Sequence, residues 1–271
     1  MGKMDTVRFF LTGGRPGKVR QLYDLIRPQT CPGLKKLRIG NRHGDGGYVM
    51  VDDFIGINAV LSLGIGDEIT WDVEMTARGL DVFQFDHTVD PPAKVATNPR
   101  LHFYKCGIAG RTTPEKNLKT ISDILADEMA DYSGDLILKI DIEGYEWDAL
   151  ALIPDEVLAR FRQICIEIHN PLARPAQRVW RNRNLSVLQK LHRIFAPVHL
   201  HANNAGFVKK LFGVTVPRAL EITYIRRDGQ AFSDSADAFP GNYDAPNVPS
   251  APEIMIGEIL QHKGQRINGL F

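Results

Sequence analysis

The sequence is poor in cysteine, nearly neutral overall and free of long apolar runs, and each absence excludes a class of protein. Its three cysteines, Cys31, Cys106 and Cys165, are odd in number and lack the C-x-x-C spacing of disulfide frameworks and structural zinc sites. Unpaired cysteines fit a reducing compartment, so we expect a cytoplasmic location. No apolar run approaches the roughly 18 to 20 residues that cross a bilayer, so we expect no membrane span.

The 33 basic and 32 acidic residues leave a formal charge of +1, which gives no electrostatic footprint for nucleic acid. Nucleic-acid binding would need a local basic patch, and one lies at residues 174–183, where arginines surround Trp180. These arginines could contact RNA phosphates beside a stacking surface, or hold a phosphorylated or acidic sugar. A solvated basic helix start beside a pocket explains them more simply, and we expect no nucleic-acid partner.

Apolar runs alternate with helical patterns along the chain, and no internal repeat interrupts them. Strands are predicted at residues 58–64, 82–85, 101–106, 136–142, 164–168, 198–201 and 219–225. Helices are predicted at residues 17–28, 70–78, 116–129, 145–152, 154–161 and 185–195. The alternation predicts an α/β fold with a seven-stranded, mainly parallel sheet and helices on both faces. Residues 203–217 have little helical pattern, which predicts that the last strand returns antiparallel.

The length suits one domain with additions at both ends. We expect a helical extension over residues 1–37, an α/β domain over 38–228, and an irregular segment over 229–271 that packs on the domain. That segment is rich in Pro, Gly, Ser and Asp. Its Phe239 and Tyr243 are candidates for contact with a substrate or a second subunit, and the oligomeric state is open.

The loop after the first predicted strand reads GIGDE, and ligands of doubly wound sheets bind at such carboxyl ends. Gly64 and Gly66 permit a tight turn and close approach to a ligand. The dinucleotide fingerprint requires a third small residue where this chain has Ile69. Asp67 and Glu68 would repel a diphosphate and suit a cationic, amino-bearing ligand. Charge therefore favours S-adenosylmethionine over NAD.

Two further strand ends favour an adenosine ligand. Asp86 ends the second predicted strand, 22 positions after Gly64, which is the spacing of a carboxylate that accepts hydrogen bonds from both ribose hydroxyls. Ile108 follows the third predicted strand among small, apolar neighbours, where it could lie against adenine or simply pack in the core.

Charged and polar residues gather at three later strand ends. Strand alternation puts Lys139, Asp141 and Glu143 on one face of an apolar strand, and their burial is costly unless they are paired. Lys139 could simply neutralise a nearby carboxylate, whereas ligand contact is the simpler explanation for the two acids. The next strands end in His169 and Asn170, and in His201 and Asn203. We expect these side chains to converge on one pocket.

Four motifs resemble those of FkbM-type methyltransferases and their methyltransferase-like relatives. They are LKIDIEGYE at 138–146, IEIH at 166–169, LHANN at 200–204, and RIG with DGGY at 38–48. The resemblance covers residues 38–225 and implies a Rossmann-like class I methyltransferase fold. Such proteins transfer a methyl group from S-adenosylmethionine, commonly to a hydroxyl of a sugar or natural product. The resemblance thus implies O-methylation of a small-molecule or saccharide acceptor.

The pattern and the resemblance together define the candidate residues. For the cofactor they are Asp45, Gly46, Tyr48, Gly64, Gly66, Asp67, Asp86, Ile108 and Asp141, with residues 45–48 forming a strap over it. For catalysis they are His169, Asp141, Glu143 and His201, and for the substrate Asn170, Asn203 and Arg174.

Methyl transfer is an in-line displacement at a sulfonium, so the protein must align the partners and remove the acceptor's proton. An imidazole near its ordinary pKa of about 6.5 can accept a proton at neutral pH, so His169 is the preferred base and His201 the substitute. Alternatively, Asp141, His169 and Asn170 hold a divalent cation, as metal-dependent O-methyltransferases do by resemblance.

Three other functions stay open on this fold. The chain could be an NAD-dependent oxidoreductase, a ligand-binding protein without turnover, or an RNA methyltransferase.

Overall fold

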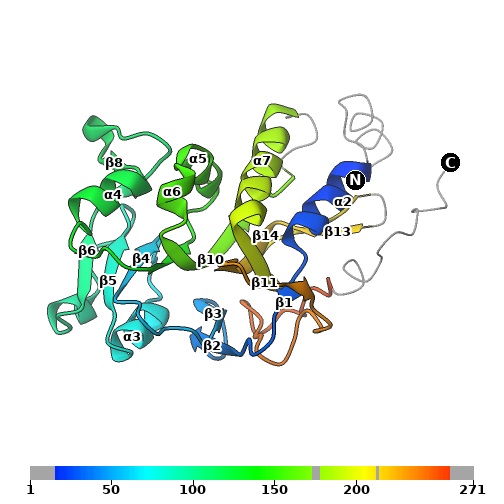
Figure 1. Cartoon of the computed structure of the whole chain (residues 1–271), viewed down its shortest axis with the longest axis horizontal. Coiled ribbons are helices and arrows are strands. Elements are labelled where there is room, and N and C mark those ends of the chain that lie inside the picture. Colours follow the sequence, from blue (N-terminus) through cyan, green and yellow to red (C-terminus); the bar gives the residue numbers. More distant parts are fainter. Residues whose placement is uncertain (1–15, 173–177, 212–213, 257–271) are drawn as a thin grey trace.

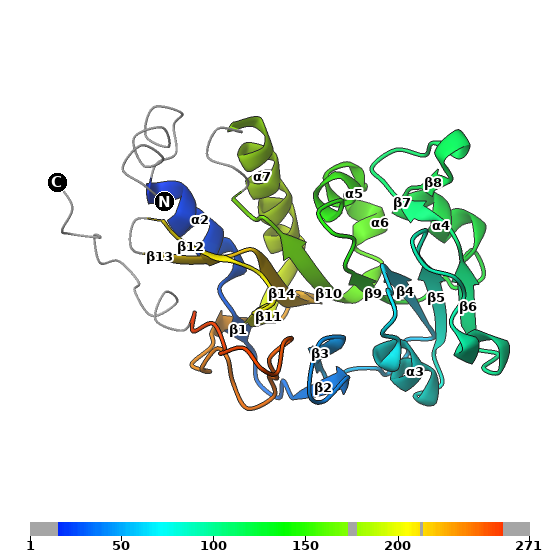
Figure 2. The same cartoon turned by 180° about the vertical axis from the view of Figure 1, so that it is seen from behind.

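The computed structural model describes residues 16–172, 178–211 and 214–256. Its central sheet has seven strands, which are β4 (Ala59–Leu63), β5 (Asp81–Phe85), β6 (Leu101–Tyr104), β9 (Leu136–Ile140), β10 (Phe161–His169), β11 (Phe195–Ala202) and β14 (Ala219–Arg226). Their order is β11-β14-β10-β9-β4-β5-β6 (Figures 1 and 2). Neighbouring strands are parallel except that β14 runs antiparallel to both β10 and β11. The seven strands and the antiparallel return of the last one are confirmed.

The helices are α2 (Pro16–Ile26), α3 (Thr70–Ala77), α4 (Ile121–Asp127), α5 (Glu146–Leu152), α6 (Asp155–Leu158) and α7 (Arg178–Ile194). Two 3-10 turns, η1 (Ala93–Ala96) and η2 (Pro114–Lys116), lie in connections. The helix predicted from residue 116 begins only at 121, because Thr120 and Asp123 form a capping box there. Among the described helices, none combines the length and apolarity needed to cross a bilayer.

Short strand pairs surround the central sheet. The pairs are β2 (Lys36–Gly40) with β3 (Gly47–Val51), β12 (Val208–Leu211) with β13 (Val214–Pro217), β7 (Gly107–Ile108) with β8 (Leu118–Lys119), and β1 (Gln29–Thr30) with β15 (Ser233–Asp234). The pair of β1 and β15 joins the predicted N-terminal extension to the predicted C-terminal segment. The division at residues 37 and 228 stays a prediction.

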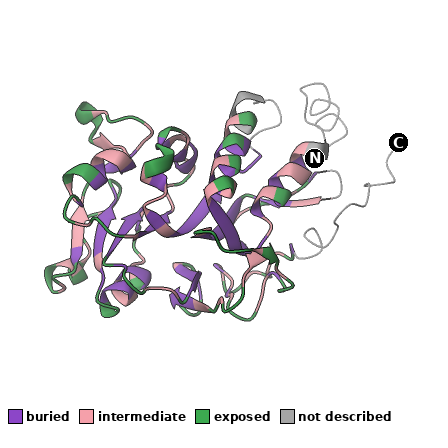
Figure 3. Cartoon of the chain, viewed as in Figure 1, coloured by how far each residue is buried: buried purple, intermediate pink, exposed green. Residues whose placement is uncertain are grey.

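The two faces of the central sheet differ in chemistry. On one face, alternate residues such as Leu138, Ile166 and Ile222 form an apolar core with α2, α4, α5 and α7. On the other face lie α3 and the β2–β3 hairpin, with Trp71 and Tyr48 in a smaller apolar cluster (Figure 1). The strands between these layers are buried along most of their length (Figure 3).

The second face also carries most of the buried polar side chains. They include Ser62, Gln84, Lys139, Glu167, His199, His201 and Glu221. An irregular segment, residues 237–253, covers this face beside the hairpin, and we call it the C-terminal strap. Asn204 donates its amide to the carbonyl oxygens of Val248, Ala251 and Pro252, which fixes the strap to the end of β11.

Candidate functional site

A row of ionisable side chains crosses the sheet at the carboxyl ends of β9 and β10. His201 on β11 pairs in register with Glu221 on β14, and Glu221 pairs with Glu167 on β10. Directly paired residues of neighbouring strands point to the same face. Asp141 follows β9 beside Glu167, and a side-chain oxygen of each lies within 4.8 Å of the other and of a His169 ring nitrogen. The structure thus brings together Asp141 and His169, as predicted, and adds two glutamates.

His169 is held between three carboxylates. Its Nδ1 lies 3.1 Å from Glu146 Oε1, and its Nε2 lies 3.3 Å from Glu167 Oε1 and 3.4 Å from Glu143 Oε2. Burial lowers the pKa of this imidazole, but Glu146 and Glu167 outweigh burial and raise the pKa to about 10. The side chain is therefore an imidazolium at neutral pH. The expectation that His169 titrates near 6.5 is wrong, because α5 and β10 supply carboxylates on both sides of the ring.

Asp141 is the group that titrates nearer neutrality. Burial, and after it the charge of Glu167, raises its pKa to about 8. Tyr48 reaches it from β3 and donates its hydroxyl to Asp141 Oδ2 over 3.4 Å. Burial raises the pKa of this tyrosine well above its ordinary value, so the phenol keeps its proton. The site therefore offers a carboxyl group able to exchange a proton near neutral pH.

Glu167 is the functional candidate that the sequence analysis missed. It is 4% exposed, and Asn203 donates its amide to both carboxylate oxygens over 3.1 and 3.3 Å. Burial raises its pKa above the ordinary range. The signal was present, because strand alternation puts residue 167 on the same face as residue 169. Asn203, predicted to contact substrate, holds Glu167 in place.

His201 has both ring nitrogens engaged and is 1% exposed. Nδ1 lies 2.9 Å from Glu221 Oε2, and Nε2 lies 3.1 Å from Glu253 Oε2 on the C-terminal strap. Burial lowers its pKa, but Glu221 outweighs burial and raises the pKa to about 9. His201 is thus a buried cation between the sheet and the strap.

The glycine loop lies against the first residue after β9. Gly64 has a φ of +74°, and a Cβ on it would overlap the carbonyl oxygen of Asp141. Only glycine fits this position. Gly66 has a φ of +52° and open space around the Cβ position, so it faces no such neighbour.

Asp86 anchors the same loop from β5. Its Oδ2 accepts the amides of Ile65 and Gly66 over 3.0 and 3.1 Å, and its Oδ1 accepts the amide and hydroxyl of Thr88 over 2.7 and 2.6 Å. Burial raises the pKa of Asp86, but these hydrogen bonds outweigh burial and lower the pKa overall. A ribose would have to share or replace some of these bonds.

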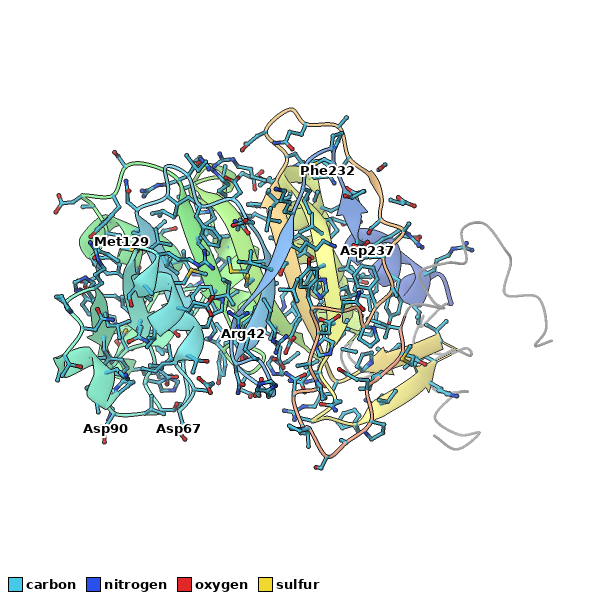
Figure 4. All side chains as sticks on the ribbon, turned by 90° about the horizontal axis from the view of Figure 1, so that it is seen from below. Arg42, Asp67, Asp90, Met129, Phe232 and Asp237 are labelled. Atoms are coloured by element: carbon cyan, nitrogen blue, oxygen red, sulfur yellow. The ribbon has the colours of Figure 1, made fainter. Side chains whose placement is uncertain are left out.

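The hairpin turn lies beside the glycine loop. Gly46 has a φ of +80°, and a Cβ on it would overlap the side chain of Glu68. Asp45 accepts the amide of Asn247 from the strap over 3.0 Å. Asp67 is exposed and points away from the molecule (Figure 4).

The remaining predicted residues are Glu143, Asn170, Ile108 and Arg174. The side chain of Glu143 is 74% exposed, with a φ of +54° and a 3.5 Å contact with Arg218. Asn170 is exposed with a φ of +49°. Ile108 is 6% exposed within the apolar core, so its contact with adenine stays a prediction. Arg174 lies outside the described residues.

Among the described residues, two groups of donor atoms could hold a cation. Asp141, Glu167 and His169 form one, and Asp45, Glu167 and Glu221 form the other, with ligand atoms within 4.8 Å of one another in each. The first group replaces the predicted Asn170 with Glu167. Carboxylate oxygens suit a hard divalent ion, but an ion on His169 would first have to displace a ring proton that is held by carboxylates.

Comparison with known proteins gives a family match for the domain that holds this site. The FkbM methyltransferase domain matches residues 55–203, which is more than half of the 271-residue chain. No curated protein matches the chain. Among solved structures, a candidate DNA modification methyltransferase encoded in an E. coli prophage is 11% identical, with 63% of this chain and 47% of that one covered and a TM-score of 0.32. This chain therefore spans about half the length of that protein. The match of the domain shows that the chain belongs to the FkbM methyltransferase family.

Proposed function

We propose that this methyltransferase uses S-adenosylmethionine and methylates a hydroxyl group of a saccharide or natural product. The observation that carries the proposal is the contact between Gly64 and Asp141 at the centre of the sheet. The strand order proceeds outward from β4 through β5 and β6 on one side and through β9 and β10 on the other. Open α/β sheets bind ligands where the order reverses in this way, which supports a Rossmann-like class I fold.

The charges around the glycine loop favour a cationic ligand. Glu68 lies on the glycine loop and Asp141 lies against the first residue of that loop, so the sulfonium and amino groups of S-adenosylmethionine would meet carboxylates. Asp86 would accept the ribose hydroxyls in exchange for part of its bonds to the loop. Residues 45–48 would cover the cofactor from the hairpin.

The chain's own residues can remove the acceptor's proton. When bound, S-adenosylmethionine supplies the methyl group. Asp141, in its charged form, would take the hydroxyl proton at a carboxylate oxygen as the acceptor oxygen bonds to the methyl carbon and the bond from that carbon to sulfur breaks, which leaves S-adenosylhomocysteine. His169, as an imidazolium, would hold Glu167 and Glu143 and keep the acceptor side of the site fixed. A divalent cation on Asp141, Glu167 and His169 is the alternative means of activating the hydroxyl, and loss of turnover in EDTA would favour it.

Calorimetric titration with S-adenosylmethionine, S-adenosylhomocysteine and NAD tests the cofactor. We expect binding of the two adenosyl ligands, no binding of NAD, and loss of binding in Asp86→Ala. Asp90→Asn is the matched control, because this acid lies four residues later and is fully exposed. Binding of NAD alone would favour an oxidoreductase, and binding of none would refute the proposal.

Turnover tests the base. We expect Asp141→Asn to keep S-adenosylhomocysteine binding and to lose methyl transfer to the acceptor, once a panel of saccharide and natural-product hydroxyls has identified one. Transfer at the wild-type rate would remove Asp141 from the mechanism. A steep loss of acceptor binding with added salt would instead point to RNA or another polyanion.

A further inference from the structure

A buried polar cluster lies beneath the glycine loop, and the proposed mechanism does not use it. Ser62 on β4, Gln84 on β5 and Lys139 on β9 pair in register across three strands. Asp72 approaches them from α3 and is completely buried. Lys139 is 4% exposed. A carboxylate and an ammonium group are therefore enclosed within the protein, which is costly unless each compensates the other.

The two charged groups lie near opposite ends of the loop. Lys139 Nζ donates to the carbonyl oxygen of Gly64 over 2.8 Å, at the start of the loop. Asp72 lies in the first turn of the helix that begins directly after the loop. Burial raises the pKa of Asp72, and the nearby Lys139 is the largest opposing influence. The lysine thus holds the first carbonyl of the loop, and a buried carboxylate lies on the helix that follows the loop.

Among the described residues, no carboxylate lies at salt-bridge distance from Lys139, and the two carboxylate oxygens of Asp72 accept no hydrogen bond. The other neighbour of Lys139 is the ring of Tyr48, whose centroid lies 5.6 Å from Nζ. On the opposite side of the loop, Asp86 accepts the amides of Ile65 and Gly66. The loop is therefore held from two directions, with Asp86 on the side of the proposed ribose and Lys139 beneath.

We propose that Lys139 is a positioning residue that sets the path of the glycine loop and thereby the affinity for the adenosyl ligand, with Asp72 as its buried opposite charge. This inference rests on the proposed function for its ligand. Lys139 fixes the Gly64 carbonyl through its hydrogen bond, and Asp72, on the first turn of α3, supplies a buried opposite charge. Neither residue needs to touch the ligand.

Three variants test the proposal: Lys139→Met, Asp72→Asn and the double variant. Each single variant leaves one buried group without its partner and should lower stability, and the double variant should recover part of that loss. Loss of a hydrogen bond from a charged donor should weaken S-adenosylhomocysteine binding by about ten- to one-hundredfold in Lys139→Met. The double variant should show the same weak binding despite its recovered stability. Wild-type affinity in the double variant would reduce the pair to a structural role and overturn the proposal.

Hydrogen exchange provides a measurement without ligand. The amides of Ile65 and Gly66 should exchange faster in the double variant than in the wild type at equal temperature and pH. Asp135→Asn is the matched control, because Asp135 precedes the same strand at its other end and pairs with Arg226. It should lose stability without changing exchange in the loop. If the wild type binds no adenosyl ligand, the proposed function fails, whereas unchanged loop exchange in the double variant refutes the positioning role by itself.

Discussion

Replacement of His169 by glutamine should destabilise the protein strongly at neutral pH and progressively less as the pH rises. The reason is that the folded protein binds a proton on this imidazole more tightly than the unfolded chain does. The pKa is raised to about 10 by Glu146 and Glu167, against burial, while the unfolded value is about 6.5. Stability from this proton is therefore complete below pH 6.5 and disappears as the pH rises through 10.

The magnitude follows from the width of that window. Within it, the free energy of unfolding should fall by at most about 1.4 kcal/mol for each pH unit because of this one group. Between pH 7 and pH 9, the difference between wild type and His169→Gln should thus shrink by about 2 to 3 kcal/mol. If Glu167 takes up a proton when the imidazolium is removed, the pH-dependent difference becomes smaller.

Urea unfolding at pH 7, 8 and 9 measures the effect, and His192→Gln is the control. Burial lowers the pKa of His192, so this ring is neutral throughout the range and its variant should show a constant difference from wild type. His201 stays in both proteins, and its own titration cancels in the comparison. A difference between wild type and His169→Gln that is independent of pH would refute the assignment of an imidazolium at this position.

Three further outcomes are expected. Gly64→Ala should lower the free energy of unfolding by about 3 kcal/mol or more in urea titrations, because a positive φ and overlap with the Asp141 carbonyl act together. Asn204→Ala should cost about 1 to 3 kcal/mol in the same titrations and speed proteolytic cleavage within residues 237–253, because three carbonyl oxygens lose their donor. Tyr48→Phe should move the acidic limb of the turnover profile to higher pH, since the Asp141 carboxylate loses the hydroxyl that favours its charged form.

The sequence predicted the central sheet well because its strands are buried on both faces. Such strands are continuous apolar runs closed by turn residues, as residues 58–64 show. The antiparallel β14 was also predictable, because residues 203–217 could not form the helix that a parallel crossover needs. In the structure these residues contain the β12–β13 hairpin. The β2–β3 hairpin was missed, and its residues were interpreted only as a strap.

The chemistry of the site was less predictable, because it depends on which strands become neighbours. Glu167 and Glu221 are 54 positions apart, and only the pairing of β10 with β14 places them side by side. Likewise, the charge of His169 depends on Glu146, which belongs to α5. Sequence spacing identified the histidine but not the carboxylates that fix its protonation. Glu253, a partner of His201, could not be predicted because the C-terminal strap that carries it has no periodic pattern.

The charges in this site should make the binding of S-adenosylmethionine depend on pH more strongly than the binding of S-adenosylhomocysteine. Buried carboxylates are compensated here by protonated His169 and His201, and Asp141 retains a pKa of about 8 in the free protein. A sulfonium placed beside Asp141 favours its charged form and should release its proton. S-adenosylmethionine should therefore bind more tightly as the pH rises from 6 to 8, with proton release that calorimetry in buffers of different ionisation enthalpy can count. S-adenosylhomocysteine has the same amino group but an uncharged sulfur, so its binding should release less. Equal proton release by both ligands would mean that the sulfonium does not lie beside Asp141, and the base would then have to be sought elsewhere.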